Sequence, residues 1–197
     1  MSHPTQKRRG TSRKPDFLPL ITEVFAECGY RRATTALLAQ RCEVRENELY
    51  RIWPTKKSMF LDAIGFVFEA VASSWAESIK QKSDITAAEQ LIESQIQNRG
   101  NSRLHRILFS GLNEVDDPEI CLALRNLYLN FHKMISGYVG EHRQRHQLQS
   151  SLGDDTIAWI MIGMGSIFDI QQELEQGTID QRRELLGQAA NAILNIR

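Results

Sequence analysis

The sequence has 197 residues, of which 42% are hydrophobic and 24% are charged, so it can bury a core and is not a disordered chain. The formal net charge is zero, but residues 1–60 hold 12 Lys and Arg against 6 Asp and Glu, whereas residues 61–197 hold 12 against 18. This asymmetry indicates that the first part meets a polyanion and that the second part does not.

The N-terminal residues 1–14 have no periodic apolar pattern and carry five basic residues between Lys7 and Lys14, which predicts a disordered basic arm. Apolar residues then recur at helical spacing from Phe17 to Cys28 and stop at Gly29, which predicts a first helix. Pro19 fits this helix only if it lies in the first turn.

Two short helices and a long one are expected next. Thr34 is a typical N-cap for the segment TALLAQRC, and the segment ENELYRIW ends at Pro54. Thr55 caps a further helix, in which apolar residues advance by threes and fours from Phe60 to Ile79. A helix of this length can join two domains.

Further helices are expected near residues 84–98, 101–115, 118–147, 154–176 and 179–196. No segment shows convincing strand alternation between turn signals, so the predicted fold class is all-α. The longest apolar stretch, residues 157–168, is shorter than the roughly 20 residues that cross a bilayer, so no membrane partner is expected. Three widely spaced cysteines without a secretory signal favour a reduced, cytoplasmic protein.

Residues 34–53 fit a helix-turn-helix, which needs a bracing helix, a tight turn and a short second helix whose outer face enters the DNA major groove. The inward face is formed by Leu38, Ala39, Val44, Leu49 and Trp53. The polar candidates for the outer face are Arg45, Glu46, Asn47, Glu48, Tyr50 and Arg51.

Around this motif the chain resembles the TetR (tetracycline repressor) family of transcriptional regulators over about residues 17–62. The residues at the family's spacings are Phe25, Gly29, Tyr30, Thr34, Leu38, Ala39, Val44, Leu49, Tyr50, Trp53, Thr55, Lys56 and Met59. The resemblance implies phosphate contacts by Thr34, Tyr50 and Lys56, and base-edge contacts by Arg45, Glu46 and Asn47. It further implies three partners: a double-stranded DNA operator, a small-molecule effector of unknown identity, and a second copy of the chain in a homodimer.

The expected domains are the arm (1–14), an N-terminal three-helix DNA-binding domain (15–60) and a C-terminal helical bundle for effector binding and dimerisation (61–197). Two residues depart from the family pattern, because Glu43 replaces the usual turn glycine and Arg45 replaces the usual serine cap. Glu46 and Glu48 add negative charge near the phosphates, which weakens non-specific attraction. The basic arm is either a solubilising tail or a contact to the minor groove or backbone.

Two further surfaces are expected in the C-terminal part. Five aromatic side chains have two possible roles: they line an effector cavity, or they belong to an ordinary core. They are Trp75, Phe109, Tyr128, Phe131 and Tyr138. Residues 157–170 are apolar on nearly every side, which predicts a homodimer interface formed with the last helix. The interface candidates are Trp159, Ile162, Gly163, Ser166, Leu186 and Ile193.

The histidines His142 and His146 have the four-residue spacing of a metal pair, but their polar neighbours offer no clear third ligand beyond Glu141 and favour a solvated helix end. No metal, cofactor or catalytic residues are therefore expected, and the protein is predicted not to be an enzyme. The favoured function is a DNA-binding repressor released by an effector. The alternatives are a helical interaction protein of the same fold with weak or lost DNA binding, and a metal-dependent enzyme using the two histidines.

Overall fold

The computed structural model describes residues 13–80, 85–97, 104–148, 151–175 and 177–194, and within these ranges it contains helices and no strands. The all-α prediction is confirmed. Residues 1–12 of the predicted arm lie outside the described residues. The helices are α1 (Lys14–Arg32), α2 (Thr35–Arg41), α3 (Glu46–Tyr50), α4 (Lys56–Lys80), α5 (Ala87–Gln97), α6 (His105–Leu112), α7 (Pro118–His146), α8 (Asp154–Glu173) and α9 (Ile179–Leu194).

Helix α1 buries one apolar face, with Phe17, Val24 and Phe25 almost fully inaccessible. Its regular helix ends where the sequence predicts, because Gly29 has a φ of 74° and only a short turn continues to Arg32. Pro19 was expected to lie in the first turn of the helix, and it does not. The helix already begins at Lys14, so Pro19 lies inside it rather than in the first turn.

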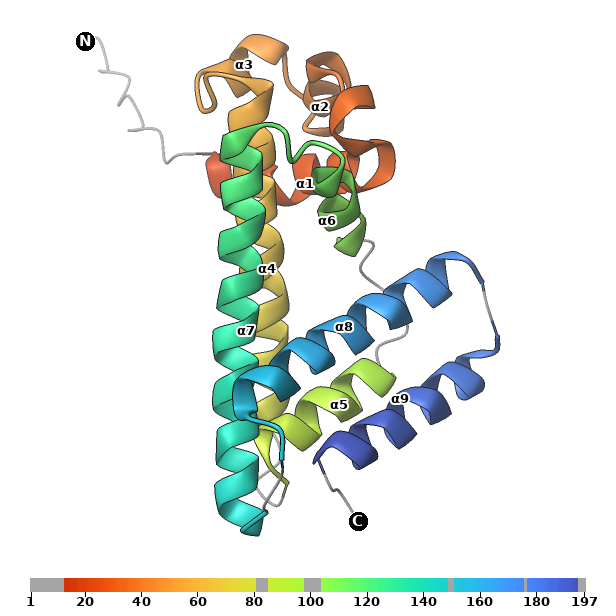
Figure 1. Ribbon diagram of the computed structural model, residues 1–197. Coiled ribbons are helices and arrows are strands. Elements are labelled where there is room, and N and C mark those ends of the chain that lie inside the picture. Colours follow the sequence, from red (N-terminus) through yellow and green to blue (C-terminus); the bar gives the residue numbers. More distant parts are fainter. Residues whose placement is uncertain (1–12, 81–84, 98–103, 149–150, 176, 195–197) are drawn as a thin grey trace, which may run out of the picture.

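The long helices α4 and α7 run side by side, and the short helices α1, α2, α3 and α6 gather at one end of this pair (Figure 1). One continuous hydrophobic core joins these elements and includes Phe25, Phe60, Ile107 and Ile120. The boundary expected after residue 60 therefore falls within α4, in the middle of a shared core. The division into two domains remains a prediction.

A second core lies beside the other half of the pair, where α5, α8 and α9 pack on one side of α7 (Figure 1). It is built around Val139, Ile157, Ala158 and Ala190, which are almost completely buried. Trp75 and Ile162 contact both cores, so the two clusters are connected.

Helix α4 is a second long apolar segment. The expectation of no membrane partner rested on residues 157–168 alone. The Lys56–Glu77 stretch of α4 is long and apolar enough to cross a membrane by length and composition, with a mean hydropathy of 1.4. The core helix of a soluble protein passes the same test. Here 28% of the stretch is buried, and its buried part includes Phe60, Ile64 and Val67, which are 0%, 1% and 2% exposed and belong to the first core.

Two glycines test the close packing of α6 on α7. A Cβ at Gly111 would lie 3.1 Å from both δ carbons of Leu124, whereas a Cβ at Gly65 in α4 would meet nothing within 4 Å. We expect Gly111→Ala to lower the free energy of unfolding by about 1–3 kcal/mol through overpacking. Gly65→Ala should raise it by about 0.5–1 kcal/mol, because alanine favours helix. Urea denaturation measures both, and equal gains for the two variants would contradict the close approach.

Candidate nucleic-acid interface

Helices α2 and α3 have the internal packing that the helix-turn-helix pattern predicts. The hydroxyl of Thr34 caps α2 by accepting a hydrogen bond from the Leu37 amide at 3.2 Å. Leu38 and Leu49 are completely buried between the helices. Trp53 is 2% exposed, and its indole N–H donates to the Asp62 carboxylate on α4. The end of α3 is thereby fixed to the long helix.

The turn between α2 and α3 shows how the chain manages without the usual glycine. Glu43 adopts a left-handed conformation with a φ of 54°. The Val44 amide bonds to the Ala39 carbonyl at 3.0 Å, and the Glu43 amide bonds to the Gln40 carbonyl at 3.1 Å. This pattern is the Schellman motif that ends a helix, and it prefers glycine at the left-handed position. The turn geometry is therefore kept, with a strained glutamate.

Helix α3 lies at the extreme end of the molecule, away from α8 and α9 (Figure 1). Arg45, at its N-cap, makes no side-chain capping bond, as the missing serine implies. Arg45 and Asn47 are exposed, and among the described residues neither has a hydrogen-bond or ion-pair partner. Tyr50 is 45% exposed. These three side chains are available to a partner.

Other predicted contact residues are already engaged within the protein. Glu46 accepts a hydrogen bond from the hydroxyl of Thr35. The Lys56 ammonium donates to the Tyr30 carbonyl at 2.9 Å and lies 4.5 Å from the centre of the Tyr30 ring. Tyr30 therefore sets the position of the Lys56 ammonium, and helical periodicity does not reveal this contact between distant residues.

The acidic residues of α3 are partly compensated by local partners. Glu48 forms an ion pair of 3.5 Å with Arg13, which directly precedes α1. Arg13 also lies over the Phe17 ring at 4.4 Å. Together with the hydrogen bond to Glu46, this pair reduces the repulsion that the sequence alone predicts between α3 and phosphates.

Polar contacts tie α1 and α4, which flank the helix-turn-helix, to α6 and α7. The Tyr30 amide donates to the Ser110 hydroxyl at 2.9 Å, and Arg31 pairs with Glu114 at 2.7 Å. Lys57, at the start of α4, pairs at 3.1 Å with Asp117, the N-cap of α7. The hydrogen bond from Lys57 lowers the pKa of Asp117. A displacement of α6 or α7 therefore acts directly on α1 and α4.

The aromatic residues proposed to line an effector cavity are not brought together at one open site. Phe131 is 8% exposed, and its ring centre lies 4.9 Å from that of Phe68 and 5.5 Å from that of Trp75, so these rings pack as core. Burial raises the pKa of Tyr128, and likewise the pKa of Tyr138. Phe109 lies on α6 beside His105. The cavity assignment remains a prediction.

An open cleft of about 640 Å³ lies elsewhere, between the end of α1 and α6. Its lining includes Arg31, Arg106, Ser110 and Glu114, and none of the five predicted aromatic residues. The cleft thus coincides with the polar contacts that join α1 to α6. No local sequence pattern pairs residues of α1 with residues about 80 positions later, so the sequence alone does not reveal this cleft.

The residues predicted for dimerisation divide into an exposed and an internal set. Trp159 is 46% exposed, and Gly163 borders open space. Leu186 is only 7% exposed in the single chain, so it offers little surface to a second copy, and its place in the interface stays a prediction. Ile162 and Ile193 are half-buried against the second core, and Ser166 bonds back to the Ile162 carbonyl.

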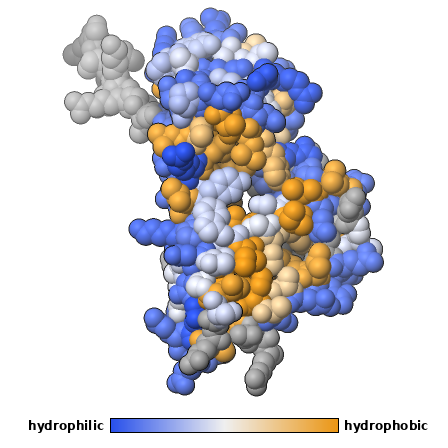
Figure 2. Space-filling model, in the orientation of Figure 1, coloured by the Kyte–Doolittle hydropathy of each residue, from blue (hydrophilic) through white to orange (hydrophobic). Residues whose placement is uncertain are grey.

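Further apolar residues in or beside α8 and α9 are exposed, several of them within the predicted stretch 157–170. They are Ile160, Ile167, Ile170, Leu174, Ile179 and Leu185. Figure 2 shows apolar side chains gathered over the middle and lower parts of one view, whereas the end formed by α2 and α3 is mainly hydrophilic. The hydrophilic and the apolar ends of the molecule are therefore suited to different partners.

Comparison with known proteins connects this geometry to a family. Residues 20–63 match the family of bacterial regulatory proteins, tetR family. Over 97 residues, 29% are identical to the nucleoid occlusion factor SlmA of Marinomonas sp. (strain MWYL1), an alignment covering 47% of this chain and 49% of that protein. The chain thus spans about half the length of this curated relative.

Solved structures share the whole fold. E. coli NemR in its reduced form superposes with a TM-score of 0.78 at 12% identity, covering 91% of this chain and 97% of that chain. A putative TetR-family transcriptional regulator from Rhodococcus sp. gives a TM-score of 0.76 at 13% identity, covering 92% and 98%. At these identities the likeness establishes the fold.

The strained turn gives a test of the interface geometry. Glu43→Gly should raise the free energy of unfolding by about 0.5–1 kcal/mol, since relief of the left-handed strain outweighs the added freedom of the unfolded chain. The matched variant Glu43→Ala keeps a Cβ and should show no such gain. Chemical denaturation of both variants measures the difference, and equal stabilities would contradict the left-handed turn.

Proposed function

We propose that the chain, whose residues 20–63 match the tetR family of bacterial regulatory proteins, binds a double-stranded DNA operator sequence-specifically and represses transcription in the cytoplasm. The observation that carries this proposal is the pair Arg45 and Asn47, exposed and unengaged among the described residues at the start of α3. The first residues of a recognition helix contact base edges in the major groove. Arginine pairs with guanine and asparagine with adenine by two hydrogen bonds each.

The contacts to phosphate come from residues around Arg45 and Asn47. The Tyr50 hydroxyl is accessible, and the Lys56 ammonium, held over Tyr30, adds a fixed positive charge. Thr34 lies at the exposed start of α2, with its hydroxyl serving as the cap. Phosphate contacts give affinity and orientation, whereas the base contacts give sequence choice.

We further propose a homodimer held by the apolar face of α8 and α9. The face is exposed in the single chain and is continuous along Trp159, Gly163, Ile167, Ile170 and Leu174. Burying such a face against a second copy removes apolar surface from water, and Gly163 permits close approach of the partner helix. Two-fold symmetry then places two α3 helices on half-sites about 34–36 Å apart.

Release by a small, partly apolar effector acts through the contacts between α6, α7 and the helix-turn-helix. Ser110, Glu114 and Asp117 hold Tyr30, Arg31 and Lys57 respectively. An effector that binds better when α6 or α7 is shifted favours a different separation of the two α3 helices. That separation no longer fits both half-sites, so the dimer leaves the operator.

The second candidate is a helical interaction protein with weak or lost DNA binding, favoured by the acidic residues Glu46 and Glu48 in α3. Selection of bound fragments from a genomic DNA pool at low salt separates the two functions. Enrichment of a shared two-fold symmetric sequence supports the operator proposal. Recovery of no enriched sequence by the dimeric protein would favour the interaction protein.

Base reading by α3 can be separated from phosphate contact. Asn47→Ala should weaken operator binding by about 1–3 kcal/mol and relax preference at one base-pair position, with little effect on random DNA. Tyr50→Phe should weaken operator and random DNA alike, because phosphate contacts carry no base information. Binding curves on the operator, its single-base variants and random DNA measure both effects. A uniform loss with Asn47→Ala would show that Asn47 does not face the bases.

The dimer face can be tested with two exposed apolar residues. Ile167 in α8 is 54% exposed and Leu122 in α7 is 53% exposed. Ile167→Glu should convert the dimer to a monomer near 22.5 kDa in light scattering and abolish tight operator binding. Leu122→Glu is the matched control and should remain dimeric. The proposed face is wrong if Ile167→Glu keeps the mass of a dimer, or if the unaltered chain is a monomer.

A further inference from the structure

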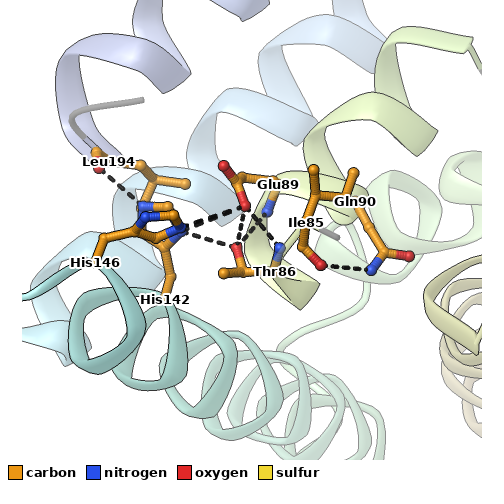
Figure 3. Close-up of polar contacts among 7 residues, drawn as sticks. All are labelled: Ile85, Thr86, Glu89, Gln90, His142, His146 and Leu194. Carbon is orange, nitrogen blue, oxygen red and sulfur yellow. Dashed lines mark hydrogen bonds and ion pairs between the residues drawn. The ribbon is translucent and has the colours of Figure 1, made fainter. Parts of the chain in front are cut away.

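A histidine pair and a carboxylate converge at the end of α7 that is remote from the helix-turn-helix (Figure 1, Figure 3). His142 and His146 lie one turn apart on α7, and Glu89 reaches them from the first turn of α5. Glu89 Oε2 lies 3.8 Å from His142 Nδ1 and 3.8 Å from His146 Nε2. One ligand atom from each of the three residues falls within 4.8 Å of the others.

The structure corrects the expectation of a solvated helix end. His142 is 1% exposed, whereas the side chain of His146 is 43% exposed. The third ligand that the sequence lacked comes from α5, not from Glu141 on the same helix. Sequence periodicity along α7 cannot reveal a residue that lies more than 50 positions earlier in the chain.

The orientation of His142 leaves one ring nitrogen suited to metal binding. Its Nε2 lies 3.0 Å from the Leu194 carbonyl, which can only accept, so Nε2 carries the hydrogen. In the neutral ring, Nδ1 then presents its lone pair toward Thr86, 2.8 Å away, and Glu89. An N–H donated to a backbone carbonyl is the usual support of a metal-bound histidine.

Glu89 is held in place by the start of its own helix. The Thr86 amide donates to Glu89 Oε2 at 2.6 Å, and the Thr86 hydroxyl oxygen lies 2.7 Å from the same atom, so the single hydroxyl hydrogen is shared between Glu89 and Nδ1 of His142. The Glu89 amide lies 3.4 Å from the Thr86 hydroxyl, which completes a capping box. Burial raises the pKa of Glu89, but the bonds from Thr86 and the nearby histidines outweigh it, so the pKa lies below its ordinary value. Glu89 is therefore an ionised, preoriented carboxylate.

We propose that Glu89, His142 and His146 bind a divalent transition-metal ion of the zinc type and so fasten α5 to α7. Two imidazoles and one carboxylate form a zinc-ligand set, whereas magnesium and calcium prefer oxygen ligands throughout. Tetrahedral ligands about 2.0–2.1 Å from zinc lie about 3.3 Å apart. The two separations between Glu89 and the histidines are 3.8 Å, and all three ligand atoms lie within 4.8 Å of one another, so the side chains close by up to about 1.5 Å when the ion binds. Solvent reaches the site beside His146 and supplies the fourth ligand.

The surrounding charges are compatible with a cation. Arg143, on the same turn of α7, forms an ion pair with Asp154 at the start of α8. The Thr86 hydroxyl has one hydrogen, which goes to Glu89 once the ion occupies Nδ1 of His142. The ion then joins three elements, because the Leu194 carbonyl at the end of α9 continues to hold His142.

Zinc titration of the tag-free, metal-stripped full chain tests the site directly. We expect one high-affinity zinc ion per chain by calorimetry and elemental analysis, together with a rise in the melting temperature, because the ion binds only the folded protein. Cobalt should give the visible absorption of a tetrahedral site. Absence of tight zinc binding would overturn the proposal.

Three variants separate the metal site from an ordinary hydrogen-bonded contact. His146→Ala and Glu89→Gln should each weaken zinc binding by about 100-fold or more, since even second-shell losses cost about 10- to 100-fold. Glutamine preserves the capping box, so Glu89→Gln should fold normally without metal. The matched control Glu141→Gln alters an exposed carboxylate beside His142 and should bind zinc as tightly as the unaltered chain. Unchanged affinity in His146→Ala would overturn the assignment.

Discussion

The packing of α4 against both ends of the molecule is the constraint on which the rest of the structure depends. Its first half buries Met59, Phe60 and Ile64 in the core shared with α1, α6 and α7. Farther along, Trp75 contacts that core and also the one built from α5, α8 and α9. Because close-packed interiors transmit displacements, a shift of the C-terminal helices can reach α1 and the first half of α4 through these connected cores.

The polar contacts around α6 are the specific place where such a displacement reaches α1 and α4. Gly29 ends the regular part of α1 so that the next amide meets Ser110, while Arg31 and Lys57 pair with Glu114 and Asp117 in the connection between α6 and α7. Surface ion pairs contribute little stability individually, about 0–1 kcal/mol. Their proposed role is therefore to fix the relative position of the elements, and linkage requires that DNA and effector influence each other equally.

Local sequence signals predicted the helices and their ends well, because caps and turns depend on neighbouring residues. Thr34 and Thr55 both cap the helices expected of them, and Gly29 ends the regular part of α1. Contacts across the fold were not predictable in this way. The burial of Leu186, the Lys56 contact to Tyr30 and the meeting of Glu89 with His142 all depend on how distant helices pack.

The central claim is that the exposed residues of α3 read a DNA sequence. The most direct measurement is the ratio of dissociation constants for a selected operator and a scrambled duplex of equal length, determined for the dimer at physiological salt. The account predicts tighter operator binding by about 10³-fold or more. A ratio near one, measured with folded, dimeric protein, would contradict it.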